Sequence, residues 1–176
     1  MEQYIITITR QFGSLGRPIA KEMADILGIE YYDRDIVEET SKKLGLPVST
    51  VSEEEESAKS HLFNMSYPLG MGTSLMQDNI LKTQADIIQK LAEKQSCIIV
   101  GRCSDYILRN RKNSIHIFIY APYHERLRNC VDILHMEPEE AKRMIQQVDK
   151  AREAYHKTYA HFLPQDFIQK HIMIDS

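Results

Sequence analysis

The chain has 176 residues and a mass of 20.5 kDa, which suits one domain that buries roughly 70% of its unfolded surface. Hydrophobic residues at 43%, charged residues at 27% and aromatic residues at 8% exclude a disordered, collagen-like or membrane-embedded chain. With 22 basic and 25 acidic residues, the net charge of -3 provides no footprint for sequence-independent nucleic-acid binding. We therefore expect a soluble domain with no nucleic-acid partner.

Cysteine usage and the N-terminus indicate the compartment. Cys97, Cys103 and Cys130 form no Cys-x-x-Cys pair, and their odd number suits a reducing environment better than a disulfide framework. The first ten residues lack the positive head and apolar run of a signal peptide, and no run of about 18 apolar residues occurs. The sequence therefore predicts a cytoplasmic protein with no membrane partner.

The N-terminal part predicts strands that alternate with helices. Residues Tyr4–Thr9 are all β-branched or aromatic, as in a strand buried on both faces of a parallel sheet. After a glycine-rich loop, Pro18 opens an amphipathic helix that Gly28 ends. A short strand over Ile29–Tyr32 then stops at Asp33, where a second helical pattern begins.

The rest of the chain repeats this alternation after an interruption. Between about residues 47 and 76 the periodicity weakens into an acidic run and a Ser-, Met- and Gly-rich stretch, for which we predict a mobile insertion. Strands separated by helices predict an α/β fold, a parallel sheet with helices on both faces. The later elements expected are a helix over Leu75–Lys94, a strand over Cys97–Val100, a helix opened by Gly101 and Arg102, a strand over Ile115–Tyr120, a helix through Leu127 and Leu134, a charged helical stretch over Pro138–Phe162, and a strand over His171–Asp175.

The loop after the first strand partly matches a phosphate-binding template. In G-x-x-x-x-G-K-[ST], backbone N–H groups and a helix N-terminus surround phosphate oxygens, and the hydroxyl binds magnesium. In the window QFGSLGRP, Gly16 fits and Arg17 keeps the charge, whereas Gln11 replaces the first glycine and Pro18 removes the hydroxyl. Arg17 is a forked donor that can bridge two phosphate oxygens. The alternative is a glycine-rich connector without a ligand.

Two polar residues end other predicted strands, at the sheet edge where open α/β folds bind ligands. Arg102 follows the strand over Cys97–Val100, so it can hold a phosphate or contact a base edge. The alternatives for Arg102 are an ion pair with Asp105 or a solvated helix face. Asp33 ends the second strand, and its alternative role is a helix N-cap.

The long helical stretch places charged groups among apolar ones. Arg152 and Tyr155 share a stripe with Ile145 and other apolar residues at helical spacing. Asp149 has Arg152 and Lys150 as candidate partners. The histidines show no ligand spacing, which argues against a structural metal.

Four blocks that occur in order resemble the bacterial cytidylate-kinase-like family, relatives of cytidylate kinase among the phosphate-loop nucleoside monophosphate kinases. They are ITITRQFGSLGRPIAKEMADILGIEYYDRD, IIVGRCSDYIL, IFIYAPYHERLRN and VDKAREAYHKTY. The resemblance implies a five-stranded parallel sheet of order 2-3-1-4-5, in a single domain with a mobile acceptor-binding part and a helical lid at about residues 138–162. It also implies ATP and Mg²⁺ as cofactors and CMP or dCMP as phosphoryl acceptor.

The resemblance also implies roles for particular residues. Asp33 and Arg102 match residues beside the acceptor nucleotide, while Asp149 and Arg152 match the acid and the arginine of the lid. Arg17, Arg102 and Arg152 are then the expected catalytic residues, and Asp33 and Asp105 are the carboxylates nominated near magnesium. The ATP phosphate loop corresponds to Gly13, Ser14, Leu15, Gly16 and Arg17.

The chain departs from the family pattern near the acceptor and in the lid. Cytidylate kinase has Asp-Gly-Arg-Asp where this chain has VGRC, ending in Cys103, and the threonine after the phosphate loop is Ile19. Val148 replaces the lid arginine before Asp149, and Arg152 precedes the second acid instead of following it. Two alternatives therefore stand beside a CMP kinase: a nucleotide-binding module that has lost transfer, and a kinase of another small metabolite.

The chain stops just after the predicted fifth strand, where relatives continue into a further helix. A shortened chain and a homo-oligomer in which another subunit covers this face are both open expectations.

Overall fold

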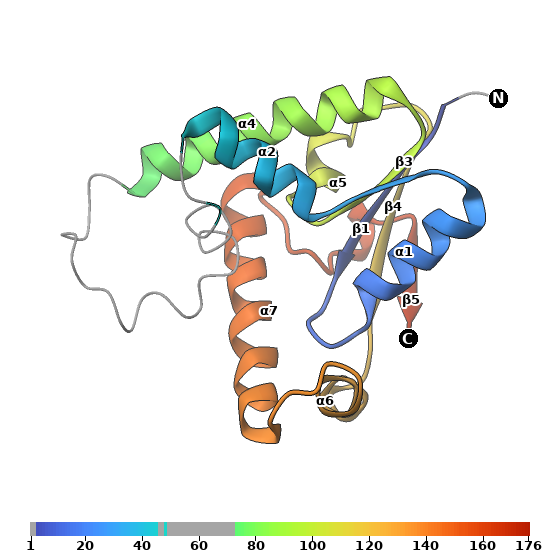
Figure 1. Cartoon of the computed structure of the whole chain (residues 1–176), viewed down its shortest axis with the longest axis vertical. Helices are drawn as coiled ribbons and strands as arrows, with labels where there is room; N and C mark the ends of the chain where they lie inside the picture. Colours follow the sequence, from blue (N-terminus) through green and yellow to red (C-terminus); the bar gives the residue numbers. More distant parts are fainter. Residues whose placement is uncertain (1–2, 46–47, 49–72) are drawn as a thin grey trace.

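Five parallel strands form one sheet in the order β2-β3-β1-β4-β5, which confirms the expected α/β architecture and strand order. The computed structural model describes residues 3–45, 48 and 73–176 (Figure 1). The strands are β1 (Ile5–Arg10), β2 (Glu30–Tyr32), β3 (Cys97–Val100), β4 (Ser114–Tyr120) and β5 (Ile172–Asp175). The helices are α1 (Gly16–Leu27), α2 (Arg34–Leu44), α4 (Thr73–Lys94), α5 (Ser104–Ile107), α6 (Tyr123–Asp132) and α7 (Pro138–Ala160), with a 3-10 turn η2 (Phe167–Gln169).

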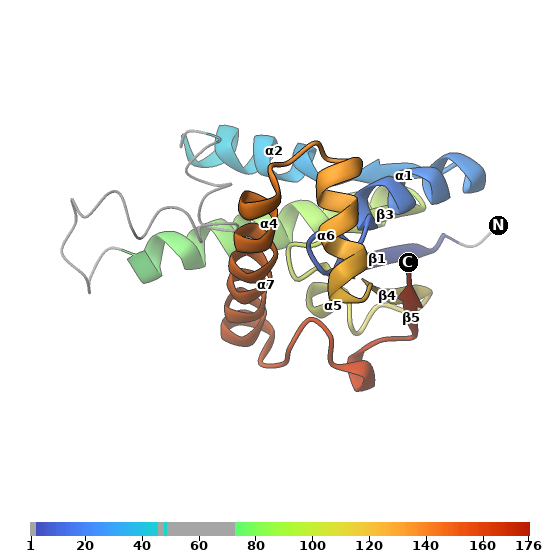
Figure 2. The same cartoon turned by 90° about the horizontal axis from the view of Figure 1, so that it is seen from below.

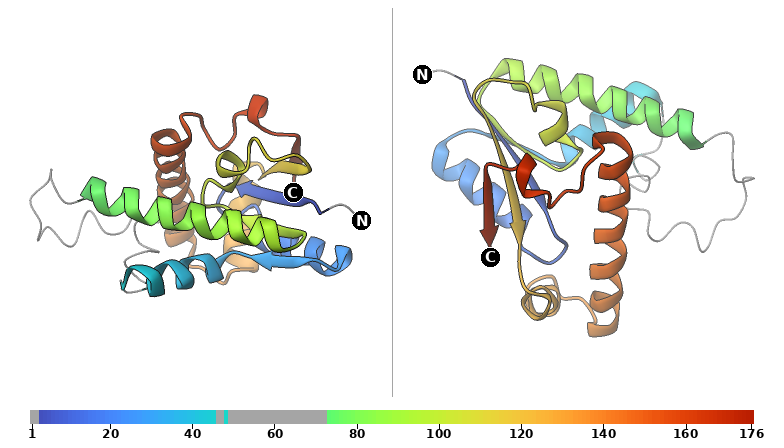
Figure 3. Two further views of the ribbon diagram at one scale, coloured as in Figure 1. Left: turned by 90° about the horizontal axis from the view of Figure 1, so that it is seen from above. Right: turned by 180° about the vertical axis from the view of Figure 1, so that it is seen from behind.

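Helices cover both faces of the sheet. Successive side chains of a strand point to opposite faces, so each face has its own set of buried residues. On one face, Ile6 and Ile8 of β1 pack with Ala20 and Ala24 of α1. On the other face, Ile5 packs in a cluster to which α2 and α4 contribute buried isoleucines and an alanine. Figures 1 and 3 show α2 and α4 side by side. The central strands β1 and β3 are buried along their whole length, as the sequence predicts for a doubly covered sheet.

Helix α7 lies next to α6 and beside the loop that follows β1 (Figure 2). Ala141 and Ile145 of α7 pack against Cys130 of α6, and Phe12 from the loop joins this cluster. The chain segment after β1 is thus held between the sheet and the long helix.

Two local differences from the sequence-based expectations concern the site. Strand β1 continues to Arg10, one residue beyond the predicted strand. The helix expected to open at Gly101 begins only at Ser104, because Gly101, Arg102 and Cys103 adopt φ angles of 74°, 60° and 50°. Such left-handed backbone cannot belong to a right-handed helix.

The predicted insertion at about 47–76 falls mostly outside the described residues. Within it, residues 73–76 already belong to α4. None of the helices in the described ranges is both long enough and apolar enough to cross a membrane.

Candidate functional site

The loop between β1 and α1 has the tight turn that an anion-binding loop requires. Gly13 has a φ of 79° and Leu15 is left-handed with a φ of 54°, directly before α1 begins at Gly16. The Ser14 hydroxyl is buried and donates to the carbonyl oxygens of Gln11 and Ile119 at 3.0 and 3.1 Å. A side chain at Gly13 would meet backbone, since its Cβ would lie 2.7 Å from the Arg126 carbonyl oxygen.

One side chain that the sequence-based prediction missed, Arg10, connects this loop to the end of β3. A Cβ at Gly16 would lie 2.7 Å from the Arg10 Cβ, and a Cβ at Gly101 would lie 2.5 Å from an Arg10 guanidinium nitrogen. Both glycines therefore make room for the same arginine. A basic residue on the last position of β1 is the signal that could have found it, since Arg102 was nominated on the same ground.

Four arginines meet at the carboxyl edge of the sheet. Burial lowers the pKa of the Arg10 guanidinium well below its ordinary value, and the positive charges of Arg152, Arg17 and Arg102 lower it further. Asp33 is the negative charge that opposes this shift. The charges that act on Arg10 are thus three arginines and one carboxylate, and such an excess of positive charge favours a bound anion.

Asp33 faces the arginines and not its own helix. Although it occupies the N-cap position of α2, its side chain makes no capping hydrogen bond, so the N-cap alternative is wrong. An oxygen of Asp33 lies 2.5 Å from Arg17 Nε and the other lies 3.7 Å from an Arg102 guanidinium nitrogen. The Tyr31 hydroxyl also donates to Asp33 at 3.4 Å, and burial followed by the Asp33 charge raises the pKa of Tyr31. Arg17 itself is 45% exposed.

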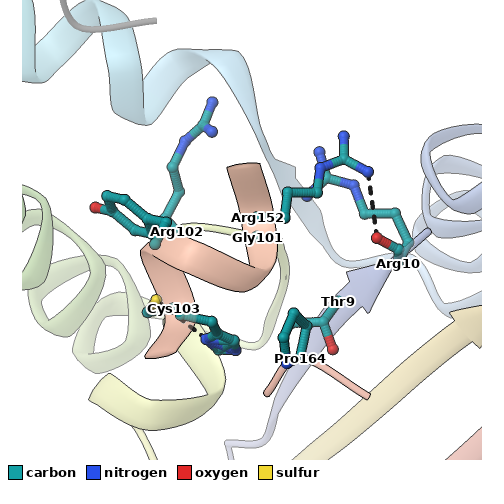
Figure 4. A pocket seen from close by; sticks show the side chains of 9 residues that line it. Thr9, Arg10, Gly101, Arg102, Cys103, Arg152 and Pro164 are labelled. Atoms are coloured by element: carbon teal, nitrogen blue, oxygen red, sulfur yellow. Dashed lines mark hydrogen bonds between the residues drawn. The ribbon is translucent and has the colours of Figure 1, made fainter. Parts of the chain in front are cut away.

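A pocket enclosing about 500 Å³, including its open mouth, lies between the end of β1, the turn after β3 and α7. Arg10, Arg102 and Arg152 all line it. Arg152 donates from its guanidinium to the Arg10 carbonyl oxygen at 3.2 Å, and Figure 4 shows this contact. The structure therefore brings Arg102 and Arg152 into one pocket, while Arg17 stands at the neighbouring carboxylate.

Asp149 ties α7 to the glycine-rich loop. It accepts a hydrogen bond from the Phe12 backbone N–H at 2.7 Å and one from Arg126 at 2.5 Å. Arg126 also donates to the Phe12 carbonyl oxygen at 3.3 Å. Neither Arg152 nor Lys150 provides the ion pair recorded for Asp149; its partner is Arg126, which the sequence-based prediction missed.

A second buried carboxylate, Asp105, has different neighbours from those expected. An ion pair with Asp105 is one of the alternatives for Arg102. In the structure Asp105 contacts His156, 3.1 Å away, and Lys170, while Arg102 lies 3.7 Å from Asp33. The other ring nitrogen of His156 lies 3.2 Å from the Cys103 sulfur. These residues form one chain of contacts, of which Cys103 and His156 line the pocket beside the arginines.

The described part of the chain contains no cluster of side chains typical of a metal site. Among the described residues, no group of three His, Cys, Asp or Glu side chains is placed to hold a metal ion. Asp105 is engaged by His156 and Lys170, and Pro18 stands in the first turn of α1 where a hydroxyl would be needed. The two nominated carboxylates are thus both engaged by cations, Asp105 by Lys170 and Asp33 by Arg17.

The fold is similar to those of several solved structures. An uncharacterized protein from Eubacterium ventriosum superposes with a TM-score of 0.71 at 27% identity, over 98% of this chain and 88% of that chain. Shikimate kinase from Bacteroides thetaiotaomicron gives 0.55 at 13% identity, over 99% and 86%. A gluconokinase from Sinorhizobium meliloti gives 0.54 at 12% identity, over 98% and 82%. The last two similarities show that the chain has a P-loop kinase fold.

Among curated proteins, no sequence matches this chain. A family model does match, over residues 5–176, and its description is the cytidylate kinase-like family. With a match that long, the chain belongs to the cytidylate kinase-like family.

Proposed function

We propose that the protein transfers the terminal phosphoryl group of ATP to a nucleoside monophosphate, with CMP or dCMP as acceptor. The family and the fold together support a kinase of a nucleotide or small metabolite. The observation that carries the proposal is the convergence of Arg10, Arg102 and Arg152 on one pocket beside the glycine-rich loop. A pocket of this charge is suited to an acceptor phosphate and to the phosphoryl group in transfer.

The glycine-rich loop is the proposed site for the ATP phosphates. Its turn from Gly13 through Leu15 leads straight into α1, so that the positive end of the helix faces the loop. Arg17, at the first turn, leaves Asp33 to bridge phosphate oxygens once they are present. Arg17 therefore has a negatively charged partner both with and without bound ATP.

The proposed reaction needs position and charge more than covalent chemistry from the protein. An acceptor phosphate oxygen forms a bond to the terminal phosphorus, and the bond from that phosphorus to the bridging oxygen breaks, which leaves ADP. Arg102 orients the acceptor, and Arg152 neutralises the equatorial oxygens of the moving group. In this proposal α7 serves as the lid, and Asp149 couples its position to Phe12 of the loop.

Magnesium, when bound to the nucleotide, supplies further charge neutralisation on the phosphates. The described side chains form no cluster of three potential ligands, so we assign no protein ligand and no step to the metal.

A nucleotide-binding module without transfer is the second candidate. The observation in its favour is the missing metal-binding hydroxyl at Pro18 together with the absence of a ligand cluster among the described residues. A kinase of another small metabolite is favoured by Cys103 in place of the family's acceptor-side aspartate.

One assay separates these functions. Purified protein is incubated with labelled ATP, magnesium and a panel of nucleoside monophosphates, shikimate and sugar acids, while calorimetry measures ATP binding. Transfer to CMP or dCMP supports the proposal, binding without transfer to any acceptor supports the module, and transfer only to another acceptor supports the metabolite kinase. Failure to bind ATP overturns all three.

A matched pair of variants tests the arginine roles on one helix. Arg152→Gln should lower turnover roughly 100- to 1000-fold if it acts on the transition state as oxyanion-hole donors do. Arg143→Gln removes an arginine that is 57% exposed on the same helix and should leave turnover unchanged. Equal turnover in both variants would remove Arg152 from the mechanism.

A further inference from the structure

Cys103, His156 and Asp105 lie in a row that resembles the nucleophile, base and orienting acid of thiol enzymes. The Cys103 sulfur lies 3.2 Å from His156 Nδ1, and His156 Nε2 lies 3.1 Å from an Asp105 carboxylate oxygen. The three residues are 3%, 3% and 2% exposed, in the same order. Two of them, Cys103 and His156, also line the arginine-containing pocket, where Figure 4 shows their contact.

The partners of His156 decide which ring nitrogen carries the proton. Asp105 also forms an ion pair with the buried Lys170, so it is an ionised acceptor, and the Nε2–H group of His156 donates to it. Nδ1 is then left as the acceptor that faces the Cys103 thiol. Burial lowers the pKa of His156, against the opposing effect of Asp105, so the neutral, basic form of the ring prevails near pH 7.

The other cysteines provide an internal contrast. Burial raises the pKa of Cys97 to about 11, and it also raises the pKa of Cys130. Cys103, by contrast, lines the pocket, whereas the described residues of its lining include neither Cys97 nor Cys130. Only a thiolate attacks efficiently, so a thiol with a base beside it and a pocket before it is set apart from two thiols packed in cores.

We propose that Cys103 is a nucleophilic thiol, activated by His156 and positioned by Asp105, that exchanges with small anionic disulfides inside the arginine-lined pocket. His156 takes the thiol proton, and the Cys103 sulfur attacks one sulfur of the disulfide. A new sulfur–sulfur bond forms as the old one breaks. The leaving thiolate takes the proton back from His156, so one disulfide and one thiol remain on each side of the reaction.

The charge of the pocket sets the preferred substrate class. Arg10, Arg102 and Arg152 line the same cavity as the thiol, so a disulfide that carries carboxylates gains charge-assisted contacts there. A cationic disulfide meets repulsion from the same groups. The mixed disulfide forms inside this pocket, and the proposal does not depend on the proposed phosphoryl transfer.

The first experiment uses the unmodified, folded protein. It is exposed to glutathione disulfide, and separately to iodoacetate and iodoacetamide, and each cysteine-containing peptide is quantified by mass spectrometry over time. Cys103 should form the mixed disulfide on the order of 100-fold faster than Cys97, whose high pKa makes its thiolate scarce. The ratio of the iodoacetate rate to the iodoacetamide rate should be higher at Cys103 than for free cysteine, because iodoacetate is an anion. About 1 M NaCl should remove this difference.

A variant then tests the base. His156→Gln should slow reaction at Cys103 about tenfold or more, while the Cys97 rate reports whether the fold has opened. Equal rates at all three cysteines of the unmodified protein would overturn the proposal, as would an unchanged Cys103 rate in a folded His156→Gln protein. Alkylation at Cys103 without disulfide exchange would overturn the assigned substrate class. Because these readouts are masses and not turnover, they are independent of the kinase assay.

Discussion

Asp33 and Asp105 are both buried carboxylates near the carboxyl edge of the sheet, at 3% and 2% exposure, yet their partners differ. Asp33 is held by arginines, one of which, Arg17, is 45% exposed and able to turn toward solvent or a ligand. Asp105 is held by Lys170 and His156, whose side chains are 0% and 4% exposed. Burial of the acid alone therefore does not distinguish the proposed ligand site at Asp33 from the fixed support that we propose for Asp105. The exposure of its cationic partners does.

The largest expected effect follows from removing the charge of the enclosed acid. Asp105→Asn leaves the Lys170 ammonium buried without its carboxylate, and the free energy of unfolding should fall by about 3 to 5 kcal/mol. Urea unfolding at pH 7 measures it. Asp35→Asn, an exposed acid in the first turn of α2, is the control and should change stability by less than about 0.5 kcal/mol. Similar losses in the two variants would break the contrast.

The second-largest effect is expected from acid, which should lower the free energy of unfolding through His116. Burial lowers the pKa of His116 to about 4 from an ordinary 6.5, so the unfolded chain takes up a proton that the folded chain refuses. The free energy of unfolding should therefore be unaffected above pH 6.5 and fall by about 3 kcal/mol by pH 4 through this group. The lowered pKa of His156 acts in the same direction.

Urea unfolding at several pH values, with His116→Gln beside the unmodified protein, isolates this contribution from that of carboxylate protonation. A stability slope that is the same in both proteins between pH 6.5 and 4 would contradict the assignment to His116.

A smaller loss of stability is expected on the arginine side. Asp33→Asn should lower the free energy of unfolding by about 2 kcal/mol, as for the loss of hydrogen bonds to charged groups, because Arg17 can turn into water. In the kinase assay, turnover by the Asp33→Asn protein should fall by a larger factor than the loss of folded protein accounts for. A loss of stability equal to that of Asp105→Asn would show that exposure of the partner is the wrong criterion.

The smallest effect is a gain of stability from an anion. Pyrophosphate at ten times its dissociation constant should raise the free energy of unfolding by about 1.4 kcal/mol, seen as a higher melting temperature. NaCl at equal ionic strength is the reference. Arg102→Gln should lose most of this gain, whereas His156→Gln should keep it. If His156→Gln loses the gain and Arg102→Gln keeps it, the anion binds near Asp105 and not near Asp33.

Most of the fold was predictable, because hydrophobic spacing and glycines are local signals. The strand over Cys97–Val100 was predicted at its observed bounds, and Gly28 ends α1 as expected. The start of α5 was not, since residues such as Arg102 and Cys103 adopt positive φ only because the tertiary structure imposes it.

The site was only partly predictable. A position at a strand end placed Asp33 and Arg102 at the same edge, and the structure brings them within 3.7 Å. Partners that are distant in sequence escaped, such as Arg126 for Asp149 and Lys170 for Asp105, because no local pattern links residues 23 or 65 positions apart. The roles of Asp33, Arg102 and Arg152 toward nucleotides stay predictions until the variants are measured.

The Arg10 side chain, fitted between Gly16 and Gly101, makes those two glycines energetically dependent on each other. A methyl group at Gly16 meets Cβ and Cγ at the root of the Arg10 side chain, and one at Gly101 meets its guanidinium nitrogen. Both press on the same side chain, so a shift of Arg10 that relieves one contact changes the other. The double variant Gly16→Ala with Gly101→Ala should thus cost less than the sum of the single variants. Two glycines far apart in the sequence behave in this respect as a single locus, and a substitution tolerated at one relaxes the constraint on the other.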